Sequence, residues 1–436
     1  MTRQMSEVSL PYGSQSVSVK VPRNNLLAVV GPNDAPPQAD VATQVRQALR
    51  APLDAGPLST SLKGGENLLL LIDDITRPTP VDRILPILLE ELGVERKRAK
   101  VTILIALGTH RKMTQEEIER KVGHEILTAF PVLNHEWDDE GALVDLGTTP
   151  NGTPIRVNRL IQEADLCLGI GNIVPHNMAG WSGGGKIVQP GICGRETTYG
   201  THLLAARSPT SNMGKMMNPV RAEIEQVASQ TKLNGVVNTV LDRHGAVVHV
   251  VAGRSQSAYQ KGVELGRSIW EVSVPRLADI VVVSSHPADL DFWQANKGLY
   301  AAERIVKRGG DIILLTPCPE GLSSQREHVS TLEALQGIPS RRLFHEARRQ
   351  GLDDYAALTV SNITACCCEL AWVTVVSDGL TEDEISVLGL ERAESVAQAL
   401  DRALKRQGDE ASIVFLTHGG ETIPVAGETQ KTRLGR

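Results

Sequence analysis

The chain has 436 residues, of which 41% are hydrophobic and 22% are charged, as is usual for a folded globular protein. Its net charge of −6 and its 3% of aromatic residues argue against nucleic acid or an anionic membrane surface as a partner. It contains neither an apolar run of about 18 residues nor the apolar core of a signal peptide, so we expect a cytoplasmic protein that does not contact a membrane.

The length predicts two domains, because a single hydrophobic core stops growing at roughly 250–300 residues. Apolar runs of strand length alternate with amphipathic runs of helix length, which predicts two α/β domains with mostly parallel sheets and an active-site cleft between them. We expect an N-terminal domain at 1–273 and a smaller C-terminal domain at 274–436 that closes the cleft. The six cysteines are too unevenly spaced for a disulfide framework.

Three predicted strands of the first domain, at 67–73, 101–107 and 165–170, are each followed closely by polar residues. Ligands bind at the carboxyl ends of the strands in open α/β sheets, so we expect these residues to meet at one edge. They are Asp74, Thr76 and Arg77 after the first strand, His110 after the second and His176 after the third.

The other predicted elements continue the same alternation. Thr114 is expected to open a helix that has Glu116 and Glu117 in its first turn. The first domain is completed by helices at 40–50, 81–92, 195–207, 218–231 and 256–269 and by strands at 235–241 and 246–252; the second contains strands at 280–284, 311–315, 372–377 and 412–416 and helices at 298–306 and 392–406.

The stretch 165–204 contains nine glycines, and such a run usually marks a place where the backbone approaches something closely. Gly183, Gly184 and Gly185 directly precede Lys186. The run is not a Walker A motif, because no serine or threonine follows the lysine, and no GxGxxG opens a helix. Lys186 is interpreted as a covalent attachment point or as a cation beside an anion; the alternative is a solvated lysine.

Two histidines are predicted at the same edge of one sheet, where proton transfer is a plausible role because the histidine pKa lies near working pH. A single loop histidine is more often structural, but His110 and His176 facing each other across a substrate can deprotonate either enantiomer of an alcohol, as a racemase requires. His202, on a predicted helix, is either a buried hydrogen-bonded residue or a metal ligand. No second histidine lies at HxxxH or HxH spacing from it, so a metal here takes its other ligands from elsewhere.

Two pairs of residues are candidates for substrate contacts. Asp74 and Arg77 form either a turn at a helix start or a clamp for a carboxylate or phosphate, since guanidinium binds planar oxyanions with two hydrogen bonds. Gln294 and Lys297 are three residues apart and share one face if a helix begins there, either at the surface or in a pocket wall.

Taken in order, the elements D-I-T-R-P, G-T-H-R, P-H-N-M-A-G-W-S-G-G-G-K-I-V-Q-P-G and T-H resemble the nickel-pincer-nucleotide-dependent lactate racemase family. The resemblance is close from about residue 73 to residue 252 and extends more loosely to W-Q-A-N-K at 293–297. It implies a covalently bound cofactor, the nickel complex of pyridinium-3,5-bisthiocarboxylic acid mononucleotide. Loading of this cofactor depends on separate cofactor-synthesis proteins.

The resemblance also implies a role for each matching residue. Lys186 matches the lysine that tethers the cofactor, and His202 matches the histidine that binds its nickel. His110 and His176 match the paired acid–bases. The other matches are Arg77, Lys297, Gln294 and Trp293 on the substrate side and Asp74, Thr76, Gly184 and Gly185 on the cofactor side.

The implied activity is that of an isomerase, a racemase or epimerase that moves a hydride from the α-carbon of a 2-hydroxy acid to the cofactor and back through a 2-keto acid. Trp293 stands where the family's lactate enzyme has a tyrosine, so the implied substrate is lactate or another short-chain 2-hydroxy acid. Trp372 is the candidate for the tryptophan that closes the family's pocket. The alternative function is a metal-dependent hydro-lyase in which His110, His176 and His202 bind the metal directly.

Overall fold

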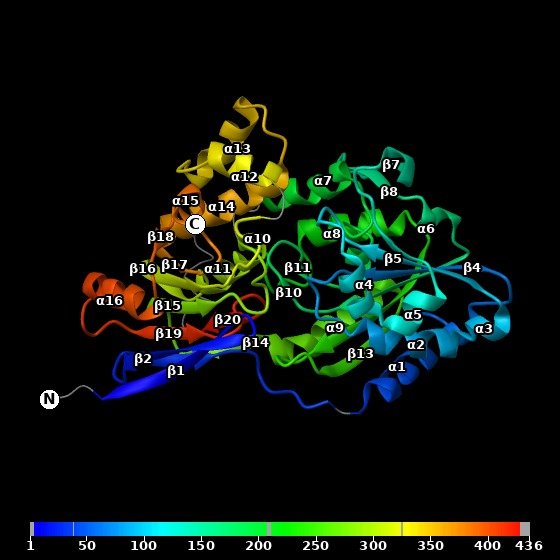
Figure 1. Ribbon diagram of the computed structural model, residues 1–436, viewed down its shortest axis with the longest axis horizontal. Helices are drawn as coiled ribbons and strands as arrows, with labels where there is room; N and C mark the ends of the chain where they lie inside the picture. Colours follow the sequence, from blue (N-terminus) through cyan, green and yellow to red (C-terminus); the bar gives the residue numbers. More distant parts are fainter. Residues whose placement is uncertain (1–3, 38, 207–210, 324–325, 428–436) are drawn as a thin grey trace.

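Two six-stranded sheets organise the chain, and helices cover their faces (Figure 1). The computed structural model describes residues 4–37, 39–206, 211–323 and 326–427. Nearly all neighbouring strands within the two sheets are parallel, so the predicted α/β class with mostly parallel sheets is confirmed.

The first sheet has the strand order β13-β12-β9-β4-β5-β6, and β13 is antiparallel to β12. Its strands are β4 (Asn67–Asp73), β5 (Lys100–Ala106), β6 (Val132–Asn134), β9 (Leu166–Asn172), β12 (Leu233–Leu241) and β13 (Val247–Gly253). The helices of this half are α1 (Val41–Arg50), α2 (Val81–Leu92), α3 (Val94–Lys97), α4 (Gln115–Val122), α5 (His124–Ala129), α6 (Leu160–Glu163), α7 (Arg195–Ala206), α8 (Pro219–Ser229) and α9 (Ser255–Trp270), with short 3₁₀ turns η1 (Leu58–Thr60), η2 (Glu140–Ala142) and η3 (Gly184–Ile187). Two small hairpins join β7 (Leu143–Thr148) to β8 (Pro154–Asn158) and β10 (Pro175–His176) to β11 (Gly180–Trp181).

Strand β4 is apolar over most of its length because both of its faces are buried. Leu68 and Leu70 belong to a core that includes residues of α1 and α2. Leu69 and Leu71 belong to the core on the other face, which includes residues of α8 and η3. The strand is thereby held in register, and its polar carboxyl end comes to lie at a defined edge of the sheet.

The second sheet has the order β18-β17-β16-β15-β19-β3, and all of its strands are parallel. Its strands are β3 (Leu26–Val30), β15 (Ala278–Ser284), β16 (Val306–Leu315), β17 (Trp372–Val376), β18 (Glu391–Arg392) and β19 (Ile413–Leu416). The helices of this half are α10 (Phe292–Ala295), α11 (Lys297–Ala302), α12 (Arg326–Ala334), α13 (Ser340–Arg349), α14 (Tyr355–Leu370), α15 (Glu382–Val387) and α16 (Val396–Gln407), and two further pairs are β1 (Met5–Tyr12) with β2 (Gln15–Pro22) and β14 (Glu271–Val274) with β20 (Ile423–Ala426).

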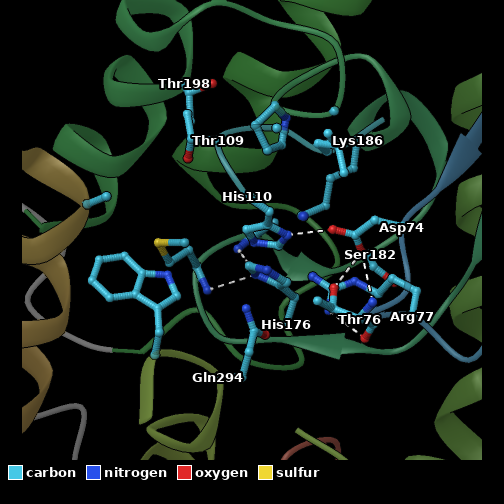
Figure 2. A pocket seen from close by; sticks show the side chains of 18 of the residues that line it. Asp74, Thr76, Arg77, Thr109, His110, His176, Ser182, Lys186, Thr198 and Gln294 are labelled. Carbon is cyan, nitrogen blue, oxygen red and sulfur yellow. Dashed lines mark hydrogen bonds and ion pairs between the residues drawn. The ribbon is translucent and has the colours of Figure 1, made fainter. Parts of the chain in front are cut away.

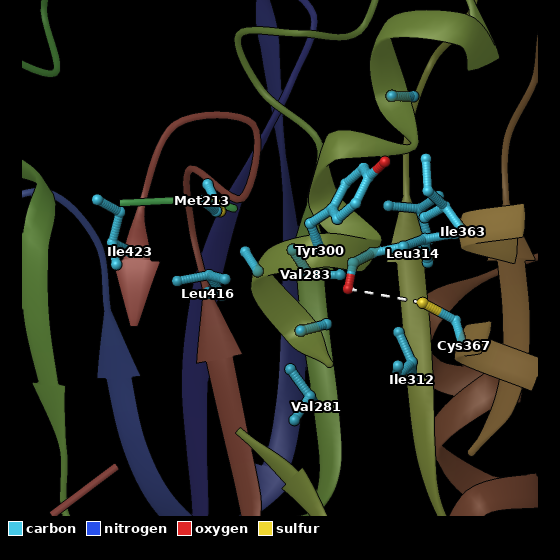
Figure 3. Packing of buried hydrophobic residues seen from close by; sticks show 14 of the residues in the cluster. Met213, Val281, Val283, Tyr300, Ile312, Leu314, Ile363, Cys367, Leu416 and Ile423 are labelled. Atoms are coloured by element: carbon cyan, nitrogen blue, oxygen red, sulfur yellow. Dashed lines mark hydrogen bonds between the residues drawn. The ribbon is translucent and has the colours of Figure 1, made fainter. Parts of the chain in front are cut away.

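Alternate residues of the second sheet point to opposite faces. Val281 and Leu314 pack against α11 and α14 in the cluster drawn in Figure 3, whereas Val282 and Phe415 pack against α16 and the β1–β2 hairpin. The cluster of Figure 3 also contains Trp270 at the end of α9, so the two halves share one apolar core. This shared core holds the two sheets in one arrangement.

The N-terminal residues do not join the first sheet. Strand β3 is the edge strand of the second sheet, and the β1–β2 hairpin packs on that sheet. The sequence analysis names no element before the helix at 40–50 and assigns 1–273 to one domain. The division at residue 273 stays a prediction, but residues 5–30 lie with the second half because their apolar side chains are buried there.

Residues that favour helix ends in the sequence lie at the observed ends of the helices. Thr114 accepts a hydrogen bond from the backbone N–H of Glu117, and the Glu117 side chain accepts one from the backbone of Thr114, which completes a capping box at the start of α4. Gly93 ends α2 with a φ of 68°, a conformation that glycine adopts without strain. The predicted helix at 195–207 corresponds to α7, although its last residue lies outside the described residues.

Several helices lie where the sequence analysis expects no element, and α12, α13 and α14 are the longest of them. The residues of α14 include several β-branched residues and three consecutive cysteines, which are weak helix formers, and its apolar residues do not follow a single stripe. Its buried residues pack against α11 and the second sheet, so tertiary packing rather than local preference stabilises the helix. All six cysteines are free, as their spacing predicts.

None of the helices in the described part of the chain is both long enough and apolar enough to cross a membrane.

We expect Leu71→Ala to lower the free energy of unfolding by about 2–5 kcal/mol, because the side chain is fully buried and its removal leaves a cavity. Leu133→Ala is the matched control: this leucine is 43% exposed in the edge strand β6, and its loss is expected to cost less than about 1 kcal/mol. Urea denaturation followed by circular dichroism measures both. Equal effects of the two substitutions would contradict the double-faced burial of β4.

Candidate active site

One pocket is lined by residues of both halves and lies at the carboxyl ends of β4, β5 and β9 (Figure 2). Ten of the twelve site residues that the sequence predicts line it: Asp74, Thr76, Arg77, His110, His176, Lys186, His202, Trp293, Gln294 and Lys297. Gly184 and Gly185 are buried but are not part of the lining.

The turn after β4 is held in place by side-chain contacts of Asp73 and Lys121. The Asp73 side chain forms an ion pair with Lys121 at 2.8 Å and accepts a hydrogen bond from the Thr79 hydroxyl. Lys121 also donates to the carbonyl oxygen of Arg77 at 2.8 Å. These contacts fix the backbone on both sides of Asp74 and Arg77, which leaves their side chains free to face the pocket.

Asp74 orients His110. Its Oδ1 accepts hydrogen bonds from the Thr76 backbone N–H and hydroxyl, and its Oδ2 lies 2.6 Å from Nδ1 of His110. Burial acts to raise the pKa of Asp74, but His110 and Arg77 outweigh it and hold this pKa well below its ordinary value. Because the ionised Asp74 accepts the Nδ1 proton, His110 presents Nε2 to the pocket.

His176 is held by backbone rather than by a carboxylate. Its Nδ1 accepts from the N–H groups of Met178 at 3.3 Å and Ala179 at 3.2 Å, so Nε2 carries the proton of the neutral ring. Burial lowers the pKa of His176 well below its ordinary value, and the charges of Lys186 and Lys297 act in the same direction. His176 therefore stays neutral, and the two pocket histidines differ in how they are held.

The turn that carries Lys186 needs its glycines for packing. A Cβ on Gly184 would lie 2.8 Å from Cβ of Tyr259, and one on Gly185 would lie 2.9 Å from Cβ of Ala228. The run of glycines therefore allows close contact with α8 and α9, and a cofactor contact for Gly184 and Gly185 stays a prediction.

A buried arginine that the sequence analysis does not identify supports this turn. Arg221, on α8, is fully buried, donates to the carbonyl oxygens of Gly183 at 3.1 Å and of Trp181, and lies 3.9 Å above the ring of Tyr259. In the sequence Arg221 is one arginine on an amphipathic helix, so nothing local distinguishes it from a surface residue.

The Lys186 amine has no acidic partner and no hydrogen bond among the residues that the structure describes. Burial lowers its pKa well below the ordinary value, and the nearby Arg77, Arg221 and Lys297 lower it further, against the smaller opposite effect of Asp74. A lowered pKa increases the neutral fraction of the amine, which is its nucleophilic form. This favours the covalent-attachment interpretation over a solvated lysine.

His202 has one nitrogen available for a metal. Its Nδ1 donates to the carbonyl oxygen of Thr198 at 2.9 Å, which leaves the Nε2 lone pair free of the ring proton. Burial lowers the pKa of His202 to about 4, although the hydrogen bond to Thr198 opposes this, so the ring is neutral as a metal ligand requires.

In the described part of the chain, no three His, Cys, Asp or Glu residues form a metal-holding group. The hydro-lyase alternative, with His110, His176 and His202 on one metal, has no such site.

The second half contributes Lys297 and Gln294, whose side chains are joined by a hydrogen bond of 2.6 Å from Nζ to Oε1. Burial lowers the pKa of Lys297 to about 7 and Arg77 adds to the shift, while Glu421 and Asp291 oppose it. Glu421, which follows β19, lines a smaller adjoining pocket together with Arg77, His176 and Lys297. The sequence analysis does not identify Glu421, because it lies more than a hundred residues after Lys297, the last of the predicted site residues.

No tryptophan from α14 or β17 closes the pocket in the described chain. Trp372 is 54% exposed on β17, where Arg406 lies over its ring, and it is not part of the lining. Trp372, the candidate for this role, therefore does not close the pocket. The side chains that α14 presents to the pocket are smaller: Ala356, Thr359, Val360 and Ile363.

Comparison with known proteins agrees with these features. Residues 12–214 match the lactate racemase N-terminal domain, and residues 274–423 match the lactate racemase C-terminal domain. The lactate racemase of Thermoanaerobacterium thermosaccharolyticum is 31% identical over 323 residues, covering 73% of this chain and 76% of the relative. That of Lactiplantibacillus plantarum is 28% identical over 422 residues, covering 95% and 99%. The structure of the lactate racemase apoprotein from T. thermosaccharolyticum superimposes with a TM-score of 0.87 at 27% identity, over 96% of this chain and 100% of that one.

The lowered pKa of Lys186 predicts unusual chemical reactivity of the protein without cofactor. An amine reacts only when neutral, so acetylation of Lys186 is expected to rise at a pH well below 10.5. Lys112 is the matched control, because its side chain is 58% exposed and its hydrogen bond to Glu136 raises its pKa. Trace labelling with acetic anhydride from pH 6 to pH 11, followed by peptide mass spectrometry, gives both curves. Coincident curves would show that Lys186 is an ordinary solvated lysine.

Proposed function

Because this chain belongs to the lactate racemase family, and is thus an isomerase, we propose that it interconverts the stereoisomers of a 2-hydroxy acid in the pocket described above. The substrate is lactate or another short-chain 2-hydroxy acid. The observation that carries the proposal is the meeting of two histidines, two carboxylate-binding cations and one nucleophilic lysine in a single pocket.

Arg77 and Lys297 are proposed to bind the substrate carboxylate. The two residues come from different halves of the chain and line the same pocket, in which Lys186 is the other lysine. A planar guanidinium pairs with both oxygens of a carboxylate, and Lys297 adds a compact charge beside it. The negative charge of the substrate also offsets the repulsion between these two cations. Substrate binding therefore favours the charged form of Lys297.

His110 and His176 are proposed to handle the proton of the substrate hydroxyl. His110, oriented by Asp74, offers a free Nε2 lone pair and accepts this proton from one enantiomer. His176 offers an Nε2–H that hydrogen-bonds to the substrate oxygen, and it acts as the acid for the other enantiomer once it has taken up the proton that His110 releases. Each histidine is thus required in both directions, because the forward and the reverse reaction both use the same two acid–base groups.

The proposed cofactor is a nickel-pincer nucleotide attached to Lys186. Three features of the pocket fit such a group: an unpaired neutral amine on Lys186, one available imidazole nitrogen on His202, and no cluster among the described residues that would hold a metal without added ligands. When bound, the cofactor supplies the acceptor for the hydrogen that leaves the α-carbon of the substrate and returns. Loading is proposed to require cofactor-synthesis proteins.

Intact-mass spectrometry and a nickel assay test the cofactor assignment in protein co-expressed with the cofactor-synthesis enzymes. The wild type is expected to carry one adduct on the peptide that holds Lys186, with about one equivalent of nickel. Lys186→Ala is expected to lose the adduct, whereas His202→Ala is expected to keep the adduct and lose most of the nickel. Lys112→Ala, an exposed lysine, serves as the control and keeps both. An adduct that persists in Lys186→Ala would refute the attachment site.

Substitution of the histidines tests the proton-transfer scheme. With loaded protein, His110→Ala and His176→Ala are each expected to lower racemisation by at least about 100-fold in both directions, since each removes a general acid–base. His345→Ala, at an exposed position on α13, is expected to keep full activity. Chiral chromatography of the products measures the rates, and unimpaired racemisation by either pocket variant would rule out a two-histidine mechanism.

A further inference from the structure

A histidine that neither the sequence analysis nor the proposed mechanism uses forms part of the pocket wall. His328, on α12, lines the pocket, and its side chain is only 5% exposed. Its Nδ1 lies 2.6 Å from Oδ2 of Asp354, which is not part of the lining. The acid thus lies behind the imidazole, and the nitrogen left for a ligand is Nε2.

The orientation of His328 is fixed on two sides. Its ring stacks on Trp293 with centroids 4.1 Å apart and planes 10° apart. Asp354 is itself held at the start of α14, where its Oδ1 accepts from the backbone N–H of Ala357 at 3.0 Å and from the Tyr199 hydroxyl at 3.4 Å. A side chain held in this way loses little conformational freedom when it binds a ligand.

Trp293 connects His328 to the substrate side of the pocket. It precedes Gln294, whose side chain is hydrogen-bonded to Lys297, the residue that the proposed function assigns to the substrate carboxylate. A ligand anchored at Lys297 that extends along Trp293 therefore reaches His328. On α14, which packs against α12 and α7, the lining residues Ala356 and Thr359 are small, so this helix leaves room for a chain longer than that of lactate.

The charges of the pocket lining favour a neutral polar group over a second carboxylate. Among the described lining residues, Arg111 is paired with Glu320 at 2.9 Å and with Glu117 at 2.8 Å. The other lining cations, Arg77, Lys186 and Lys297, already have roles in the proposed function, so none is left for a second anionic group. His328 is paired with Asp354, and its imidazole nitrogen pairs well with a hydroxyl.

We propose that His328 binds a hydroxyl group on the chain of the substrate, so that the preferred substrates are 2-hydroxy acids with further hydroxyl groups, of the sugar-acid type. The inference rests on the proposed function for the reaction at C2 and adds the chemical class of the rest of the molecule. Asp354 and Trp293 act as positioning residues for His328.

Matched pairs of acids test the proposal on the loaded protein. One pair is 2,3,4-trihydroxybutanoate and 2-hydroxybutanoate, and the second is a six-carbon aldonate and 2-hydroxyhexanoate; malate is added as the dicarboxylic acid. We expect kcat/KM of the wild type to be about 10- to 100-fold higher for the polyhydroxy member of a pair, since a site built to bind a hydroxyl disfavours the analogue that lacks it. A preference for the deoxy acids or for malate would overturn the proposal.

The variant His328→Phe/Asp354→Asn keeps a ring on Trp293 and leaves no buried charge unpaired. It is expected to lose the preference for polyhydroxy acids while it retains turnover of the deoxy acids, and His328→Gln is expected to keep part of the preference. His124→Phe removes an exposed histidine that is also paired with an acid, at 2.8 Å from Glu119, and should leave the ratio unchanged. An equal loss for both members of each pair would show that the His328–Asp354 pair only holds α12 to α14.

A binding measurement on protein without cofactor separates the two proposals. We expect polyhydroxy acids to raise the melting temperature of the wild type more than their deoxy partners do, and the double variant to show no such difference. If the loaded wild type converts no acid but this difference in binding is present, the proposed reaction is wrong and the hydroxyl site stands. If it converts 2-hydroxy acids without any effect of His328 on binding or on the kcat/KM ratio, the reaction stands and the hydroxyl site is wrong.

Discussion

Repulsion among buried cations is the constraint on which the rest of the pocket depends. Arg77, Lys186 and Lys297 line one volume, and Arg221 lies fully buried beside the turn that carries Lys186. With water largely excluded, each positive charge raises the free energy of the others, and the groups that can release a proton do so. The pocket therefore favours the neutral forms of Lys186 and His176, a combination that suits covalent attachment and proton transfer.

The scaffold holds these side chains at fixed positions. Both faces of β4 are buried, so the strand cannot slip, and the turn after it is anchored by the Asp73–Lys121 ion pair. The Lys186 turn is pressed against α8 and α9 so closely that a Cβ on Gly184 or Gly185 would collide with its neighbours. Rigid placement matters because proton transfer and metal binding both fail when a group is displaced by about 1 Å.

The two halves of the molecule supply different parts of the pocket. The first half contributes the groups proposed for the cofactor, for proton transfer and, with Arg77, for the carboxylate, while the second contributes Lys297, also proposed for the carboxylate, and His328, proposed for a hydroxyl on the substrate chain. The residues proposed for the reaction and those proposed to select the substrate chain lie on different helices and strands. Substitutions can therefore change substrate choice without changing the reaction.

The sequence by itself determined most strands of the two large sheets and most residues of the pocket, because buried parallel strands are apolar throughout and their polar ends follow directly in the chain. Asp74, His110, His176 and Lys186 are all found from these local signals. Tertiary structure alone decided the rest. Strand β3 joins the far sheet, α14 is helical against its local preferences, and Arg221, Glu421 and His328 reach the site or its supports from distant segments. In each of these cases the deciding interaction is a packing or charge contact between residues far apart in sequence, and no local pattern of amino acids records such a contact.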